Sequence, residues 1–358
     1  MAYKPPYVIN TSILNKVATI MKMIGKFSSL NNLSSLPLLR RKNQIKSIHS
    51  SLAIENNQLS ESQVKDIING KLVIGPQKDI LEVQNAIRVY EKIQDINPYT
   101  QKDLLKYHKL LMTSLVPDAG SYRKGQVGVF DDEKAIFMAP PADRVPSLIN
   151  NLYDYLNYYD ENIFIKSCVF HYEFEFIHPF SDGNGRMGRL FQTCLLAKEE
   201  ALFYYLPVES IIRKKQQTYY EAISKSNLEG SSNVFIEFIL DAIIETMNET
   251  LKQFNIDKES ISVQAKKLLR IFEDGIPYTT LELMQKVNLK SRSSFKMHYL
   301  DPLLKAGMIE MTLPETPNSR NQRYVKKWDV KYSWIYTTLE NKIRIIKYDG
   351  IIHFTREK

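Results

Sequence analysis

Cysteine is almost absent from this chain, since Cys168 and Cys194 are the only two in 358 residues. Both fall within apolar helical patterns, which predict buried, reduced thiols rather than a disulfide or a metal site. No apolar run approaches the roughly 18 to 20 residues that cross a bilayer. The first residues, Met1-Ala-Tyr-Lys-Pro-Pro, lack the apolar stretch of a signal peptide. We therefore expect a cytoplasmic protein that has no membrane partner and uses no cysteine chemistry.

Glycine and proline are also scarce, at 13 and 15 residues, and most apolar residues recur at spacings of three and four. This pattern predicts a mainly α-helical protein. Strand-like alternation occurs around Asp131-Asp132, where 126–130 and 134–138 are expected to form a hairpin. The longest expected helices cover 144–159, 163–177, 186–200, 214–226 and 233–254.

The formal net charge is +8, and most of it lies in one segment. Residues 258–328 contain thirteen Lys and Arg against seven Asp and Glu. Such a local excess can serve nucleic acid, an acidic partner or only solubility.

This basic segment also has a distinct pattern of expected elements. Helices at about 262–273, 279–287 and 291–305 precede strand-like pieces at 308–313 and 323–327, which is the order of a winged helix. In the third helix, Phe295, Tyr299 and Leu303 are expected to point inward. Arg292, Lys296 and His298 are expected to point outward, which suits a DNA groove, phosphates or a protein contact.

Four regions follow from this pass along the chain. Residues 1–110 form an N-terminal helical region, 111–255 a catalytic core, 256–330 a winged-helix-like domain and 331–358 an extension of unassigned structure. Within the first region, Ile45, Ile48 and Leu52 share one helical face, and Asn56-Asn57 is a plausible C-terminal cap. The sequence from Ser60 to Gln63 has the spacing of a capping box.

The densest group of reactive residue types is His178-Pro-Phe-Ser-Asp-Gly-Asn-Gly-Arg-Met-Gly-Arg189. Gly183-Asn184-Gly185 predicts a tight loop that leads into a helix N-terminus, where backbone N–H groups and the helix dipole favour an anion. Arg186 and Arg189 are three residues apart, so both can direct forked donors to phosphate oxygens.

Two further residues complete the chemistry of this run. Asp182 supplies one carboxylate, which suits Mg²⁺ held jointly by the protein and by nucleotide phosphates. His178, expected at the end of the preceding helix, can accept a proton near neutral pH. A base, a cation ligand, an anion cradle and two arginines together predict phosphoryl or nucleotidyl transfer.

This run resembles the Fic family motif His-Pro-Phe-x-Asp/Glu-Gly-Asn-Gly-Arg-x-x-Arg, with all nine specified positions met. The resemblance implies a helical core in which His178 activates a Tyr, Ser or Thr hydroxyl of a target protein to attack the α-phosphate of ATP. It also implies that Asp182 holds Mg²⁺, that 183–185 cradle the α and β phosphates, that Arg186 binds the phosphate chain and that Arg189 binds the γ-phosphate. The related Doc branch, a phosphorylating group, carries Ala-Asn-Lys instead of Gly-Asn-Gly and does not match.

The resemblance extends to weaker assignments outside the motif. The expected hairpin at about 125–139 takes the place of the family's flap, which clamps the target segment as an added strand. Ile136 and Met138 would then border the nucleotide. Tyr219-Tyr220 and Asn227 resemble the stretch that contacts adenosine, with Tyr220 and Asn227 as the ligands.

An N-terminal segment resembles the family's inhibitory motif, Ser/Thr-x-x-x-Glu-Gly/Asn. Here Ser51-Leu-Ala-Ile-Glu55-Asn56 meets it, on an expected helix at about 43–57. The resemblance implies that Glu55 pairs with Arg189 and denies the γ-phosphate its partner. In Fic proteins of this design the same glutamate supports AMP removal, so addition and removal both stay open.

Other functions remain open from the sequence alone. A regulator that binds DNA through the winged helix is one alternative, and a Fic enzyme with another nucleotide or a phosphocholine donor is a second. The target protein and the oligomeric state, a homodimer included, are not fixed by this sequence.

Overall fold

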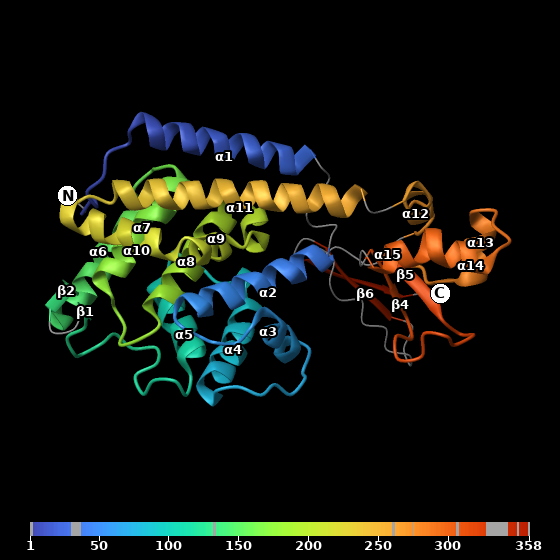
Figure 1. The fold of residues 1–358 in the computed structure, drawn as a ribbon, viewed down its shortest axis with the longest axis horizontal. Helices are drawn as coiled ribbons and strands as arrows, with labels where there is room; N and C mark the ends of the chain where they lie inside the picture. The colour runs from blue at the N-terminus through green and yellow to red at the C-terminus, as the bar shows by residue number, and fades with distance from the viewer. Residues whose placement is uncertain are drawn as a thin grey trace. The chain divides into compact units, whose positions relative to one another are not determined.

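The structure is a computed structural model that describes residues 3–29, 37–131, 134–259, 262–273, 275–305, 308–326, 343–348 and 351–356. The chain divides into two compact units, residues 1–26 with 42–251 and residues 27–41 with 252–358. The first unit is mainly helical, as the residue spacing predicted (Figure 1). Its elements are α1 (Thr11–Ser29), α2 (Pro37–Ile54), α3 (Glu61–Ile68), α4 (Gln77–Tyr90), η2 (Ile93–Asp95), α5 (Gln101–Met112), β1 (Gly128–Asp131), β2 (Lys134–Met138), η3 (Ala142–Arg144), α6 (Val145–Tyr158), α7 (Ile163–Ile177), α8 (Asn184–Glu199), η4 (Ala201–Tyr205), α9 (Val208–Lys214), α10 (Gln216–Glu229) and α11 (Asn233–Glu259).

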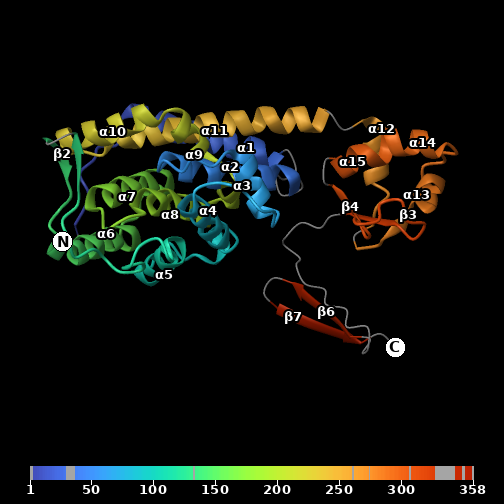
Figure 2. The same ribbon diagram turned by 60° about the horizontal axis from the view of Figure 1, so that its bottom comes forward.

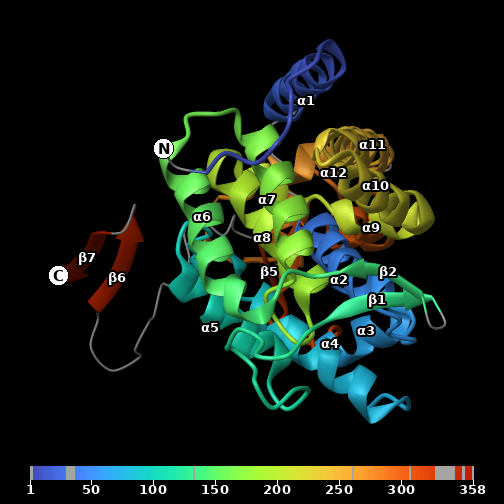
Figure 3. The same ribbon diagram turned by 90° about the vertical axis from the view of Figure 1, so that its left-hand side faces the viewer.

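Helix α7 is the centre of this unit, with apolar residues on all its faces and most of its side chains buried. A helix that is apolar all round must lie inside the fold rather than on its surface. Helix α8 packs against it, with the rings of Phe170 and Phe191 6.2 Å apart (Figure 3). Gly188 permits this approach, because a Cβ there would lie 3.0 Å from the ring of His171. The two helices that flank the motif are therefore fixed to each other.

Polar contacts place α1 along α11 (Figure 1). Ser12 donates to Glu237 at 2.8 Å, and Lys16 pairs with Asp241. Cys168 and Cys194 are fully buried free thiols, as predicted, and burial raises the pKa of both. No helix in the described parts of the chain is long and apolar enough to span a membrane.

The expected hairpin is present, with β1 and β2 antiparallel and Gly128 opposite Met138. Asp132, in the expected turn, lies outside the described residues. The capping box at Ser60 is also confirmed, since Ser60 accepts from the Gln63 amide and Gln63 accepts from the Ser60 amide. Helix α2 ends at Ile54, and Asn56 adopts the left-handed conformation, with φ 66°, that the expected cap requires.

After α11, the described residues of the second unit form short helices, a small antiparallel sheet and a separate antiparallel strand pair. Its elements are α12 (Val263–Leu269), β3 (Tyr278–Thr279), α13 (Thr280–Lys286), α14 (Arg292–Phe295), the π-helical turn η5 (Lys296–Leu300), α15 (Asp301–Lys305), β4 (Ile309–Met311), β5 (Arg323–Lys326), β6 (Ile343–Tyr348) and β7 (Ile351–Arg356). Two differences from the expectation stand out. The sheet has a third strand and the order β3-β5-β4, and the helix expected over 291–305 contains a π-helical turn.

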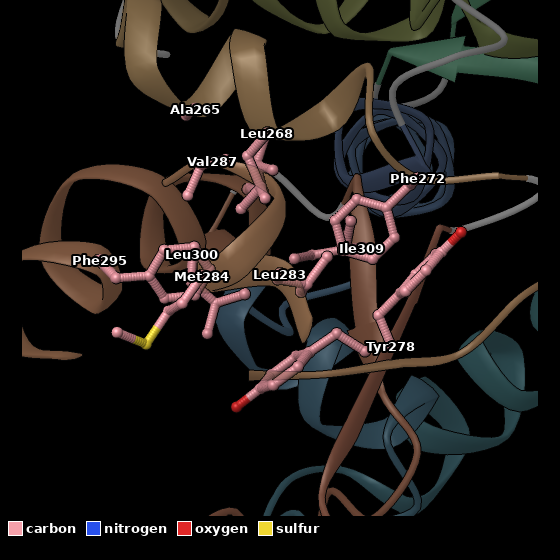
Figure 4. Close-up of a cluster of buried hydrophobic side chains, with 12 residues drawn as sticks. Ala265, Leu268, Phe272, Tyr278, Leu283, Met284, Val287, Phe295, Leu300 and Ile309 are labelled. Carbon is pink, nitrogen blue, oxygen red and sulfur yellow. The ribbon is translucent and has the colours of Figure 1, made fainter. Parts of the chain in front are cut away.

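The core of this unit is one apolar cluster beneath the sheet and helices (Figure 4). Phe295 and Leu303 are fully buried in it, as predicted, and Tyr299 is partly buried against the Phe295 ring. Arg292, Lys296 and His298 are exposed. The segment of unassigned structure contains the antiparallel pair β6–β7, with Ile343 opposite Arg356 (Figure 2).

Candidate active site

The loop between α7 and α8 carries the catalytic candidates, and its shape depends on two residues. His178 ends α7 in the left-handed conformation, with φ 50° and ψ 60°. Asn184 closes the loop, because its Oδ1 accepts from the Phe180 amide and its Nδ2 donates to the Phe180 carbonyl, both at 2.9 Å. Asn184 is 2% exposed, so its side chain is committed to the loop and leaves only its backbone N–H for a ligand.

The imidazole of His178 is oriented by the helix it ends. Its Nδ1 lies 3.2 Å from the Glu175 carbonyl, and a carbonyl can only accept. The hydrogen of the neutral ring is therefore on Nδ1, and the lone pair of Nε2 is left to take a proton. His178 is partly exposed, as a base that meets an external substrate must be.

A second histidine, which the sequence did not single out, supports the loop from below. The ring of His108 stacks on Phe180 at 3.6 Å between centroids, with 4° between planes. Its Nε2 donates to the Asp182 carbonyl at 3.0 Å, and its Nδ1 accepts from the Gly120 amide at 2.9 Å. Burial lowers the pKa of His108 to about 4, so the ring is neutral and keeps both bonds. Phe180 is fully buried and anchors the loop.

Helix α8 begins two residues earlier than the sequence predicted. Gly183, with φ 86°, is its N-cap, so Asn184 and Gly185 belong to the first turn rather than to a loop. A Cβ at Gly183 would lie 2.8 Å from the Met112 sulfur. The first backbone N–H groups of α8 have no partner within the helix, and together with the helix dipole they form an anion site.

Arg186 lies between two carboxylates. Its Nη1 is 3.2 Å from Glu82, and its Nη2 is 2.8 Å from Asp182. Glu82 also accepts from the Asn57 side chain at 2.8 Å. Asn57 follows α2, so the end of that helix is connected to Arg186 through Glu82.

Arg189 lies at the N-terminal part of α8 and is bound by α2. Its Nη2 is 2.7 Å from the Glu55 carboxylate and 3.0 Å from the Ser51 carbonyl, and its Nε donates to the Ser51 hydroxyl at 3.2 Å. The Arg189 side chain is only 1% exposed. Burial is the largest influence on the pKa of Arg189 and lowers it, but the charge and hydrogen bond of Glu55, together with Tyr219 and Glu175, raise the pKa overall. The predicted partners Ser51, Glu55 and Arg189 are thus brought together.

The Glu55 carboxylate also rests on the first turn of α8. A Cβ at Gly185 would overlap the Glu55 Oε1 and lie 2.9 Å from Arg189 Nη1. Glycine at 185 therefore leaves space for one anionic group between the helix N-terminus and Arg189, and Glu55 fills it.

Comparison with known proteins shows the family to which this chain belongs. The profile of the Fic/DOC family matches residues 98–196, and the profile "Filamentation induced by cAMP protein Fic-like, C-terminal domain" matches 263–325. The crystal structure of a Fic family protein from Desulfovibrio desulfuricans is 42% identical and superimposes with a TM-score of 0.69. The match covers 91% of this chain and 98% of that one. The chain belongs to the Fic family.

Relatives with lower sequence identity match a smaller part of this Fic protein. A protein adenylyltransferase Fic from Nematostella vectensis is 29% identical over 62% of this chain, and one from Aedes aegypti is 28% identical over 65%. The matched parts are 52% and 46% of those proteins, so the chain spans about half the length of these relatives. Fic-1 from C. elegans, at 20% identity and a TM-score of 0.57, shares the fold.

Three of the four residues assigned from the Fic resemblance outside the motif have described side chains. Met138 is 50% exposed in β2, and the side chain of Ile136 lies outside the described residues. Tyr220 is 44% exposed and donates to the Ile54 carbonyl at 3.3 Å, so it contacts the last residue of α2, next to Glu55. Asn227 accepts from the Tyr172 hydroxyl at 2.9 Å.

Tyr219, named beside Tyr220, is 1% exposed, and its hydroxyl lies 3.1 Å from His171. It is a core residue. Neighbouring residues of a helix point about 100° apart, so Tyr219 of α10 faces the core while Tyr220, the residue named from the Fic resemblance, is exposed.

The donor set at Asp182 fits a magnesium ion shared with a nucleotide. The Asp182 side chain is 42% exposed and is held by Arg186 and by the Gly183 amide. Within the described residues, no three His, Cys, Asp or Glu side chains converge on a metal position. One accessible carboxylate suits Mg²⁺ that takes its other ligands from water and phosphate.

Proposed function

We propose that this Fic protein transfers AMP from ATP to a Tyr, Ser or Thr hydroxyl of a target protein. One observation carries the proposal: a carboxylate, that of Glu55, occupies the anion site formed by the α8 N-terminus, Gly185 and Arg189. The position is built for negative charge, and a phosphate is the anion that a helix N-terminus with two adjacent arginines accommodates. The names of the adenylyltransferase relatives support the same reaction.

The reaction proceeds by attack on the α-phosphate. Nε2 of His178 takes the proton from the target hydroxyl, the oxygen bonds to the α-phosphorus, and pyrophosphate leaves with the electrons of the broken P–O bond. The N–H groups of 183–185 stabilise the charge that develops on the phosphate oxygens. Asp182 would hold a Mg²⁺ ion, which would supply positive charge to the phosphates when ATP is bound.

The two arginines serve the remaining phosphates. Arg189 binds the γ-phosphate, which fixes ATP with the α-phosphate facing His178. Arg186 stays paired with Asp182 and directs its charge to the phosphate chain. The β1–β2 hairpin clamps the target segment by strand addition, so that its hydroxyl meets His178.

Glu55 restrains this reaction by competing with the γ-phosphate for Arg189. Since the guanidinium is buried, it can hold one anion at that position, and the bound nucleotide is left without its third phosphate contact. The resting protein is therefore an inhibited enzyme. AMP removal through the same glutamate is the alternative direction, and another nucleotide or phosphocholine is the alternative donor.

The test is auto-modification with α-labelled ATP and Mg²⁺. Glu55→Gly should raise labelling, and the double variant Glu55→Gly/His178→Ala should abolish it. Glu91→Gly, at an exposed helix end, is the matched control and should label like the unmodified chain. Equal labelling with and without His178 would contradict the mechanism. Label from the γ-phosphate would indicate a kinase, and loss of AMP from a pre-labelled protein only when Glu55 is present would indicate removal.

The target is then accessible by the same route. The Glu55→Gly variant incubated with cell lysate and α-labelled ATP should label a small set of proteins, which mass spectrometry identifies with their modified residues. If the Glu55→Gly variant labels lysate proteins no more strongly than the Glu55→Gly/His178→Ala double variant does, transfer to a protein target is contradicted.

For the second unit we propose a binding role of the winged-helix type, accessory to catalysis. The exposed Arg292, Lys296 and His298 stand opposite the buried Phe295 and Leu303, which gives the helix one cationic outer face. A protein surface, a second copy of the chain or DNA phosphates could meet it. Retention on duplex DNA that falls steeply with salt and is lost in Arg292→Gln/Lys296→Gln would assign DNA. Salt-independent self-association in ultracentrifugation would assign a homodimer.

A further inference from the structure

Arg123 lies outside the Fic motif but is bonded to the loop that carries it. Its side chain is 3% exposed and donates only to backbone carbonyls. Nε donates to the His178 carbonyl at 2.7 Å, and Nη2 donates to the Ile177 carbonyl at 3.3 Å. The Arg123 amide donates to the Pro179 carbonyl at 2.9 Å. One residue thus binds three successive carbonyls around the catalytic histidine.

The same guanidinium binds both ends of the flap. Nη1 donates to the Gly125 carbonyl at 2.8 Å, before β1, and Nη2 donates to the Pro140 carbonyl at 2.5 Å, after β2. Between these ends the two strands pair with each other, and the Ala139 amide donates to the Val127 carbonyl at 3.1 Å (Figure 3). The hairpin is therefore fixed at its base to the histidine loop through one side chain.

Physical reasons favour arginine at this position. The carbonyls at the end of α7 have no partners within the helix and carry its negative dipole end, which a buried cation complements. Only the planar fork of a guanidinium can direct separate donors to carbonyls from three segments, and the point charge of lysine cannot replace it. Burial lowers the pKa of Arg123, but the group remains charged because its ordinary pKa is so high.

We propose that Arg123 is a positioning residue for AMP transfer: its guanidinium fixes the base of the flap against the backbone of His178. The inference rests on the proposed function. The flap sets the position of a target strand that adds to it, and the end of α7 sets the position of His178. The distance from the target hydroxyl to Nε2 is therefore set through Arg123, while the ATP contacts on α8 are not.

Arg123 should therefore affect the rate of AMP transfer without affecting the KM for ATP to a similar extent. In the Glu55→Gly parent, Arg123→Lys should lower the rate of protein labelling at saturating ATP on the order of 100-fold, the scale expected for an ångström of misplacement. The KM for ATP should change less than about threefold, because the α8 contacts are retained. Lys124→Gln, which removes the adjacent exposed cation, should keep the parent's rate.

Hydrogen–deuterium exchange on the same proteins gives an independent measurement. Amides of 125–131 and 134–140 should exchange faster in Arg123→Lys, with those of α8 unchanged. An unchanged labelling rate, unchanged flap exchange, or a parallel loss of ATP binding and melting temperature would each overturn the positioning role. A Glu55→Gly parent without label would contradict the proposed function itself, and the positioning role would fall with it.

Discussion

The carboxylate of Glu55 lies 2.7 Å from the guanidinium of Arg189, although 134 residues separate them in the sequence. Glu55 remains 30% exposed, whereas Arg189 is almost completely buried. The pair is therefore asymmetric. A buried cation without an anion is strongly unfavourable, so Arg189 requires some negative partner at all times. In this structure Glu55 is that partner, and on the proposed function the γ-phosphate of ATP replaces it.

If a phosphate replaces Glu55 at Arg189, Glu55→Gln should lower the melting temperature without nucleotide but increase the stabilisation that ATP gives. Without nucleotide, the variant should melt at a lower temperature, since Arg189 loses its charge partner at a cost on the order of 3 kcal/mol. With saturating ATP and Mg²⁺ its melting temperature should rise more than that of the unmodified chain, because the γ-phosphate then restores the pair. Differential scanning fluorimetry measures both, with Glu91→Gln as the control. An equal ATP-induced shift in both proteins would contradict the competition.

Gly185→Ala should reveal contact between Glu55 and α8. The added methyl group overlaps the Glu55 carboxylate, so it should destabilise the unmodified chain by about 1–3 kcal/mol, typical of overpacking. In the Glu55→Gly background the main clash is gone, and the cost should be smaller. A double-mutant cycle on melting temperatures measures the difference. Additive effects of the two changes would show that Glu55 does not rest on Gly185 in solution.

Glu82→Gln should destabilise the protein through Arg186. Both side chains are about 5% exposed, and removal of one buried charge leaves the other poorly compensated. The expected loss is on the order of 3 kcal/mol, which corresponds to roughly 6–12 °C for a unit of this size. Glu229→Gln, exposed at the end of α10, should leave the melting temperature within about a degree. A loss at Glu82 no larger than at Glu229 would argue against a buried pair.

His108 should make stability depend on pH. Because its pKa is about 4 in the folded protein and about 6.5 when unfolded, the unfolded chain binds more protons between these values. The stabilisation is complete above pH 6.5 and is lost as the pH falls toward 4, by on the order of 3 kcal/mol. Asp118 and Asp182 oppose this shift and Arg186 adds to it, but burial is the largest cause. His108→Gln should flatten the melting profile over that range, and an unchanged slope would exclude His108 as its origin.

Helix boundaries were predicted well where apolar spacing was regular. The expected 163–177 coincides with α7, and the expected 144–159 differs from α6 by one residue at each end. The prediction failed where a single side chain shifts a boundary. Helix α8 starts at Asn184, where the side-chain amide of Asn184 hydrogen-bonds to the backbone of Phe180. Such a local contact leaves no periodic pattern in the sequence. The third strand of the C-terminal sheet, two residues long, is too short for alternation to reveal.

The sequence by itself determined the chemistry available here: a histidine, an acid, three glycines and two arginines in twelve residues, and a glutamate in the right motif far upstream. Local spacing is enough for the twelve-residue run, because the end of one helix and the start of the next bring its residues together. Only the tertiary structure decided which residues these groups contact. Arg186 is held by Glu82, the motif loop rests on His108, and the flap is bonded to His178 through Arg123. These contacts join segments far apart in the chain, and they exist because buried charges and carbonyls must find partners once the helices pack.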